Sequence, residues 1–81
     1  MARYFFDTHD GKALLRDEVG IELDDLERVR AEAIDALPDM AREELPDGNE
    51  RVFAVQVRDE EGRVVFAATL TFKSEWGAPP R

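Results

Sequence analysis

The chain has no cysteine, and it has a single histidine (His9) and a single serine (Ser74) among its 81 residues. The absence of cysteine excludes disulfides and thiolate metal sites, and it is typical of proteins from reducing compartments. One histidine also leaves too few ligands for an ordinary zinc site. We therefore expect neither a metal nor another cofactor.

Long apolar runs are absent as well. The N-terminal segment has only three consecutive apolar residues, Tyr4-Phe5-Phe6, too few for the apolar region of a signal peptide. No stretch approaches the roughly 20 apolar residues that a membrane span requires. The sequence thus predicts a cytoplasmic protein that does not enter a membrane.

Positive charge is scarce in the middle of the chain. Residues 17–50 hold thirteen acidic residues against three arginines, and the whole chain carries a formal net charge of −8. Affinity for nucleic acid depends mainly on cations that contact phosphates, and no stripe of Lys or Arg elsewhere compensates. The sequence predicts no direct binding of DNA or RNA, and a basic protein is the charged partner that this region favours.

Two segments have the alternation or composition of β-hairpins. Residues 3–9 are rich in aromatic and β-favouring types and end at Asp10-Gly11, which predicts a strand and a tight turn. A short second strand is expected at about residues 12–16, followed by a turn at 17–20. Residues 51–58 and 63–72 alternate around the loop 59–62, where Gly62 can adopt a positive φ.

The segment between the hairpins predicts a helix from residue 24 to about 44. Asp24 is a suitable N-cap, and Glu27 completes a capping-box pattern. The expected apolar stripe consists of Leu26, Val29, Ala33, Leu37 and Met40. Pro38 interrupts the segment, so either the helix kinks there or a second short helix begins. Because Met40 keeps the phase of the stripe, we favour one kinked helix.

The predicted order is β-β-α-β-β. A helix with one apolar stripe can be buried against one face of an antiparallel four-stranded sheet, which gives an α+β two-layer sandwich. We expect a single domain over residues 1–73 and a flexible C-terminal tail over 74–81. Trp76 in this tail has three interpretations: an anchor for a partner, a side chain packed beside the sheet edge, or a side chain without packing contacts.

Several motifs together resemble a known family of short bacterial proteins that are classed as domains of unknown function. The motifs are Arg3-Tyr4-Phe5-Phe6, Asp10-Gly11, Asp17-Glu18 with Gly20, Glu22-Leu23, Asp25-Leu26, Arg30-Ala31-Glu32-Ala33, and Val57-Arg58-Asp59-Glu60 with Gly62-Arg63-Val64. The resemblance covers about residues 2–72 and implies an intracellular domain that stands alone, without an established activity. A weaker topological likeness links the chain to the antitoxin subunit of HicAB-type systems.

The residues offer little for catalysis. His9 lies between Asp7 and Asp10, but no third group completes an acid–base arrangement, so we expect a surface residue. Acidic pairs occur at 17–18, 24–25, 43–44 and 60–61. None has the spacing of a calcium loop, and we interpret them as solvated or capping charges. We predict no catalytic residue and no enzyme.

One surface stands out in the predicted sheet. If Tyr4 and Phe6 face the helix, the opposite side of the sheet carries mainly apolar residues and threonines, which we call the outer face. It consists of Phe5, Val52, Ala54, Val65, Ala67, Thr69 and Thr71. Two subunits that stack these faces or pair their edge strands would form a homodimer, whereas Val and Thr also favour strands that remain wet.

The sequence thus favours a non-enzymatic protein-interaction module that binds itself or a basic protein. The alternative is a regulatory, antitoxin-like subunit whose acidic surface covers a basic partner.

Overall fold

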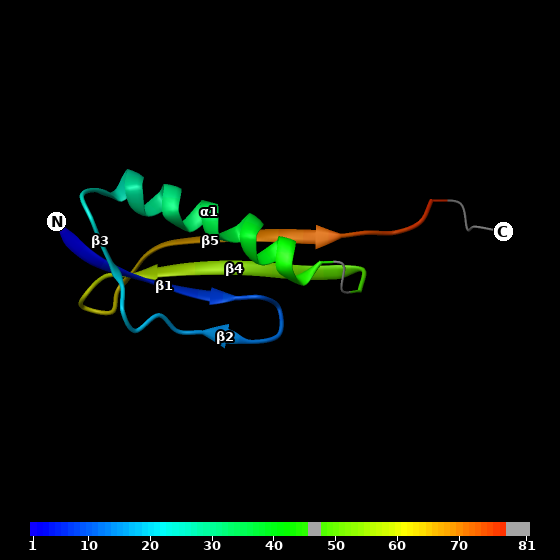
Figure 1. Cartoon of the computed structure of the whole chain (residues 1–81), viewed down its shortest axis with the longest axis horizontal. Helices are drawn as coiled ribbons and strands as arrows, with labels where there is room; N and C mark the ends of the chain where they lie inside the picture. The colour runs from blue at the N-terminus through cyan, green and yellow to red at the C-terminus, as the bar shows by residue number, and fades with distance from the viewer. Residues whose placement is uncertain (46–47, 78–81) are drawn as a thin grey trace.

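A computed structural model describes residues 1–45 and 48–77. One helix packs on an antiparallel sheet (Figure 1), and the α+β prediction is confirmed. The elements are β1 (Ala2–His9), β2 (Leu14–Leu15), β3 (Ile21–Leu23), α1 (Leu26–Glu44), β4 (Glu50–Arg58) and β5 (Val64–Lys73).

The sheet has five strands, so the predicted count of four is wrong. Its order is β2-β1-β4-β5, and β3 also pairs with β1. The expected strand at residues 12–16 is reduced to Leu14–Leu15, opposite the end of β1, while Ile21–Leu23 forms a strand of its own opposite the start of β1. Strands β2 and β3 are separate because, between them, the Asp17 carboxylate accepts the N–H of Phe6 at 3.0 Å. At that point of β1 a side chain takes the place of a partner strand.

Helix α1 is continuous from Leu26 to Glu44 and passes through Pro38, so a second helix does not begin there. The N-cap is Asp25 and not Asp24 as predicted. The Asp25 side chain accepts the N–H of Arg28 at 2.9 Å, which satisfies one of the free donors of the first turn. The helix ends at Leu45, whose N–H donates to the carbonyl of Ala41.

The core lies between α1 and the middle of the sheet. It consists of Leu23, Val29, Ala33, Leu37, Phe53, Val55 and Val57. Tyr4 and Phe6 of β1 pack against it, so the inward face of β1 is as predicted. Leu26 does not belong to this core: it is the first helical residue and is 61% exposed, one turn before Val29 reaches the sheet.

The β4–β5 hairpin has the predicted loop. Gly62 has a φ of 85° and donates its N–H to the carbonyl of Asp59 at 3.0 Å. The Asp59 carboxylate accepts the N–H groups of Glu61 and Arg63, both at 2.9 Å. A side chain therefore fixes the reversal of the chain.

After β5 the chain leaves the sheet. The N–H of Ser74 donates to the carbonyl of Asn49 at 2.7 Å, and this bond continues the β4–β5 pairing by one residue pair. Trp76 is 81% exposed. Residues 78–81 of the predicted tail, and residues 46–47 of the predicted stop after the helix, lie outside the described residues.

Candidate functional site: the outer face and its ion pair

The structure places the predicted outer-face residues together on the side of the sheet opposite α1. Three strands contribute, because Ala54 of β4 lies opposite His9 of β1 and also opposite Thr69 of β5. Along the same row, Val52 lies opposite Thr71. The alternating residues of β4 point the other way and are buried beneath the helix.

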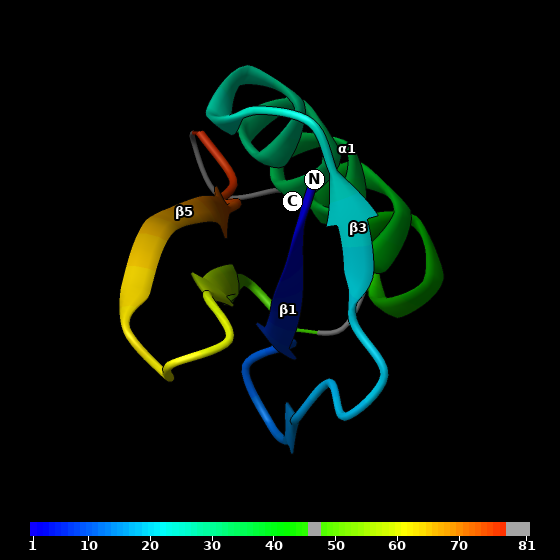
Figure 2. The same ribbon diagram turned by 90° about the vertical axis from the view of Figure 1, so that its left-hand side faces the viewer.

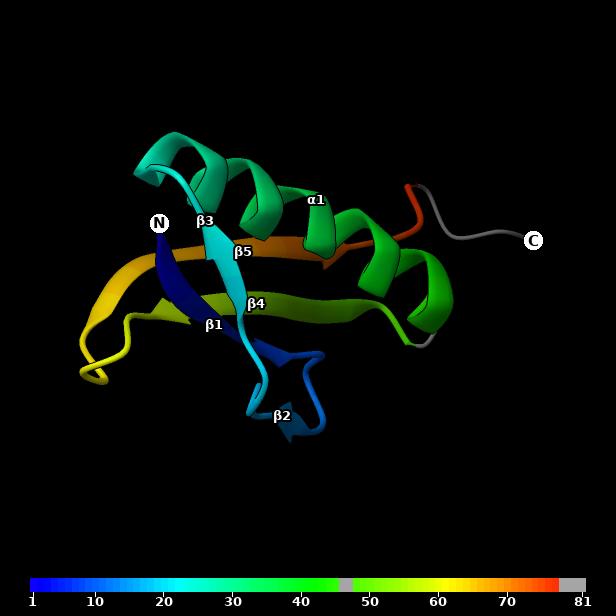
Figure 3. The ribbon, with the colours of Figure 1, turned by 60° about the vertical axis from the view of Figure 1, so that its left-hand side comes forward.

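Much of this surface is accessible. Val52 is 44% and Val65 is 38% exposed. Ala67, Thr69 and Thr71 are exposed as well, whereas Phe5 and Ala54 are half-buried. Within the described part of the chain, α1 is the only helix and lies on the other side of the sheet (Figure 3). The outer face therefore has no second layer in the described structure, and the register also places Gln56, Arg58 and Asp7 on this side of the sheet.

The charges on this side of the sheet are paired with each other. Asp7 is only 7% exposed. Its Oδ2 accepts from Nε of Arg58 at 2.7 Å and its Oδ1 from Nη2 at 3.1 Å. The guanidinium also lies 4.9 Å from the centre of the Phe5 ring. This bidentate pair is the strong form of a charge-assisted contact, and it was not identified from the sequence.

Both groups are held in their charged forms. The hydrogen bond from Arg58 lowers the pKa of the Asp7 carboxyl, against the opposing effect of burial. The same bond raises the pKa of Arg58. The pair carries no net charge, so a second surface can cover it without stranding a single ion.

Asp17 connects this pair to the returning chain. Its Oδ1 accepts the N–H groups of Val19 and Gly20 at 3.0 and 3.1 Å, and its own N–H donates to Asp7. Burial disfavours the ionised carboxylate, but the hydrogen bonds from Phe6, Gly20 and Val19 outweigh it and the pKa is lowered. The sequence signal is an acid before a glycine turn, which predicts a solvated or capping charge. Asp17 is of the capping kind, and its additional bonds to Phe6 and Asp7 have no sequence signal.

A second arginine is buried on the helix side of the sheet. Arg51 is 7% exposed; its Nη2 lies 3.2 Å from Oε1 of Glu44, and its Nε donates to the carbonyl of Asp10 at 3.0 Å. It also lies over the ring of Phe53. Arg51 thus joins the end of α1, the first turn and β4, and its surroundings assign it to the framework of the fold.

His9 is exposed on the outer side of the sheet. Its Nδ1 accepts the N–H of Gly11 at 3.0 Å, and it borders an open hollow of about 420 Å³ together with Asp7 and Arg58. The Asp7 carboxylate is bonded to Arg58 through both of its oxygens. Asp7 therefore forms an ion pair with Arg58 and is not arranged for acid–base chemistry with the imidazole of His9.

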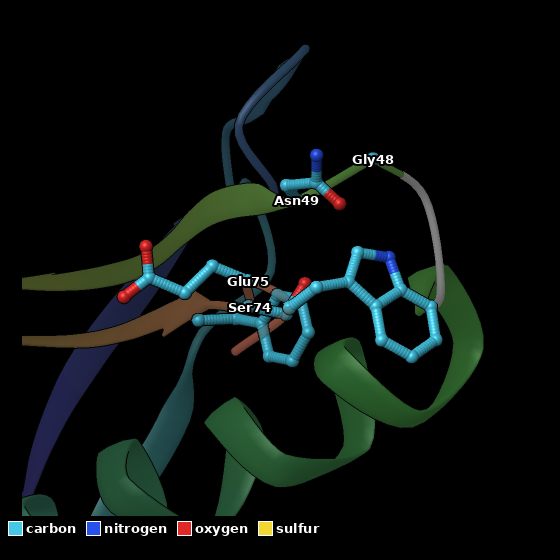
Figure 4. Close-up of a pocket in the computed structure, with 6 residues that line it drawn as sticks. Gly48, Asn49, Ser74 and Glu75 are labelled. Carbon is cyan, nitrogen blue, oxygen red and sulfur yellow. The ribbon is translucent and has the colours of Figure 1, made fainter. Parts of the chain in front are cut away.

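Another hollow lies between the start of β4 and the end of β5 (Figure 4) and measures about 520 Å³. Its lining includes the Phe72 and Trp76 side chains, the Gly48-Asn49 segment, Ser74 and Glu75. Glu75 is the only ionisable side chain among these lining residues. The hollow offers aromatic contact surface, but no group of charges or ligands converges on it.

The solvent side of α1 is acidic. Asp25, Glu27, Asp35, Asp39 and Glu43 are exposed there, and Asp39 pairs with Arg42 at 2.7 Å. Such exposed charges form a surface for a basic partner but contribute little to stability.

Residues 1–45 and 48–77 contain no group of three or more His, Cys, Asp or Glu side chains arranged to hold a metal ion. No helix among them combines the length and the hydropathy needed to cross a membrane.

Comparison with known proteins places the chain in a family. Residues 3–71 match the family described as Domain of unknown function (DUF6894), and because the match covers most of the chain, the protein belongs to that family. No curated protein and no solved structure matches the chain. The resemblance to a family without an assigned function is thus confirmed.

Proposed function

We propose that this domain is a non-enzymatic protein-interaction module and that a second copy of the chain is its partner. The outer face carries the proposal, since it is a largely apolar surface that lacks a covering layer in the described structure. Antiparallel sheets usually bury one face and present polar residues on the other. Apolar residues on the second face are typical of a surface that is covered in an assembly.

The charges near the outer face are compatible with the burial of this face against a second copy. Asp7 and Arg58 satisfy each other, and all buried side-chain nitrogen and oxygen atoms in the described structure have hydrogen-bond partners. Stacking of two such faces would remove apolar surface from water, at about 25 cal/mol for each Å². It would leave no buried ion without a counter-charge.

The proposal is tested by the mass of the particle in solution. We expect light scattering at micromolar concentration to give a mass above that of one chain, and we expect Val52→Glu to lower it. A carboxylate at Val52 would have to be buried without a partner, so the dissociation constant should rise at least tenfold, which corresponds to about 1.4 kcal/mol.

The matched control is Ala31→Glu, which adds the same charge on the exposed side of α1. It should leave the mass unchanged. Equal masses for wild type and Val52→Glu would refute a role for the outer face in self-association. A wild-type mass equal to one chain would refute self-association itself.

The acidic side of α1 favours a second candidate function, a regulatory subunit that covers a basic protein. The supporting observation is the row of exposed acids; among the residues that the structure describes, Asp39 alone of this row pairs with an arginine, Arg42. A basic protein that co-purifies from the native host and dissociates as salt rises would support this function. Retention of that partner after Asp35→Lys and Asp39→Lys would argue against the helix as its binding surface.

A further inference from the structure

The two borders of the sheet differ in how they are built. On the side of β1 the border consists of β2 and β3, which are two and three residues long, and between them Asp17 holds the chain in a loop. The other border is β5, a strand of ten residues. Short, interrupted strands are a known means of preventing edge pairing, whereas a long regular edge permits it.

Strand β5 has none of the usual protections over most of its length. It contains no proline, and Lys73 at its end is its only charged residue. Val64, Val65 and Leu70 are 53%, 38% and 38% exposed. In the described structure no strand pairs with the side of β5 away from β4, and that side is open in Figure 2.

The hydrogen-bond pattern shows which backbone groups face this open side. Ser74 donates to Asn49, in register with the pair Lys73 and Glu50. Since the bonding direction alternates along a strand, the even-numbered residues of β5 bond to β4. The N–H and C=O groups of Ala67, Thr69, Thr71 and Lys73 are therefore directed outward. The register shift near Val64 confines this regularity to the part of β5 after Val65.

We propose that β5 pairs with β5 of a second copy in antiparallel orientation, with a two-fold axis at Thr69, to give one continuous sheet. The inference rests on the proposed function only in that the partner is another copy of this chain. In this register Thr69 lies opposite Thr69 of the second copy, and Ala67 lies opposite Thr71. These outward-directed groups then form about six backbone hydrogen bonds.

The side chains are complementary in the same register. On the helix side Phe66 lies opposite Phe72 of the second copy, and Ala68 lies opposite Leu70. These are the non-hydrogen-bonded positions, where cross-strand side chains approach most closely and aromatic pairs are favourable. Phe66 and Phe72 are half-buried in the single chain, so the pairing would cover their remaining surface.

The charge on the strand agrees with this arrangement. Lys73 is the only charged residue of β5, so the paired strands bring no like charges opposite each other. The outer faces of the two copies would then form one surface of double width, so that edge pairing and face stacking use different groups and are compatible.

The test uses disulfide trapping in a chain that has no cysteine of its own. Thr69→Cys places two cysteines across the two-fold axis at about 5.5 Å between Cα atoms, within the range that a disulfide accepts. We expect mild oxidation to cross-link this variant, in a fraction roughly tenfold above that of Ala67→Cys. The Ala67 positions of two copies would lie about 13 Å apart along the strands.

A mixture of Ala67→Cys and Thr71→Cys chains supplies the second arm. These positions are opposite each other in the proposed register, so the mixture should give a disulfide between the two different chains, whereas each variant alone should not. Equal cross-linking at every position would indicate random collision and would overturn the inference.

The remaining outcomes separate the two proposals. Thr69→Cys should still cross-link in a Val52→Glu background, because Val52 does not lie on the edge. A wild-type mass above one chain without the Thr69→Cys cross-link would refute edge pairing and leave the face-stacking proposal intact. A monomeric wild type without cross-links would refute both.

Discussion

Two glycines with the same backbone conformation should respond very differently to substitution by alanine. Gly20 has a φ of +78° and Gly62 a φ of +85°. At Gly20 an added Cβ would lie 2.8 Å from Cγ of Arg3 and 2.9 Å from Cε2 of Phe5, whereas nothing lies within 4 Å at Gly62. Gly20→Ala therefore combines backbone strain with a steric clash, and Gly62→Ala tests the strain alone.

The magnitudes follow from these two contributions. A left-handed conformation costs an alanine about 1–2 kcal/mol, partly offset by the smaller entropy of the unfolded chain, about 0.4–1 kcal/mol. Overpacking adds about 1–3 kcal/mol. We expect Gly62→Ala to lower the free energy of unfolding by about 1 kcal/mol and Gly20→Ala by about 2–4 kcal/mol.

Urea denaturation followed by circular dichroism measures both values, and thermal unfolding provides a second scale. Each kcal/mol corresponds to about 4–8 °C in Tm for a domain of this size. The ring that Gly20→Ala would displace is that of Phe5, which lies beside Arg58. Equal losses in the two variants would refute the reasoning, because the clash would then contribute nothing.

Three further predictions concern the helix start, the core and acid. Asp25→Ala should cost about 1 kcal/mol of unfolding free energy through loss of the N-cap. Asp24→Ala should cost less than half of that. If urea denaturation gave the reverse order, Asp24 would be the cap. Phe53→Ala should cost about 3–5 kcal/mol, since the side chain is fully buried, and a loss below 1 kcal/mol would contradict its place in the core. The lowered pKa values of Asp7 and Asp17 mean that their stabilisation is complete above about pH 4, the unfolded value, and is lost as pH falls through the folded pKa values. Urea curves at several pH values should show this decline, and Asp17→Asn should reduce its slope.

The parts of the fold that a regular pattern specifies could be predicted from the sequence. The helical spacing of Val29, Ala33 and Leu37 placed them against the sheet, and the alternation of Phe53, Val55 and Val57 identified the inward side of β4. These predictions succeed because burial of apolar side chains selects one face of each element.

The parts that depend on side-chain hydrogen bonds between distant segments could not be predicted. The turn at residues 17–20 was predicted, but its attachment to β1 was not, because it depends on the Asp17 carboxylate, which accepts the N–H of Phe6. The ion pair of Asp7 and Arg58 joins positions that are far apart in the chain. Neither contact has a periodic signal, because a single acid before a turn has the same pattern whether its side chain is solvated or bonded to another strand.

The candidate site also has parts that could be predicted from the sequence and parts that could not. The membership of the outer face followed from strand alternation, and its residues lie together in the structure. The neutralisation of Asp7 by Arg58 required the register between β1 and β4, which composition does not specify. The open side of β5 likewise required the strand order, which places β5 at a border of the sheet.

The loop at Asp17 has a consequence for the size of any assembly. A sheet that offers a pairing edge on both sides can add copies without limit and grow into a filament, whereas a sheet with one interrupted border cannot. By holding residues 17–20 away from the ladder, one aspartate would make growth by strand addition stop at two chains. The effect of substituting Asp17 should therefore be measured by turbidity and sedimentation, which report assembly size, as well as by the free energy of unfolding.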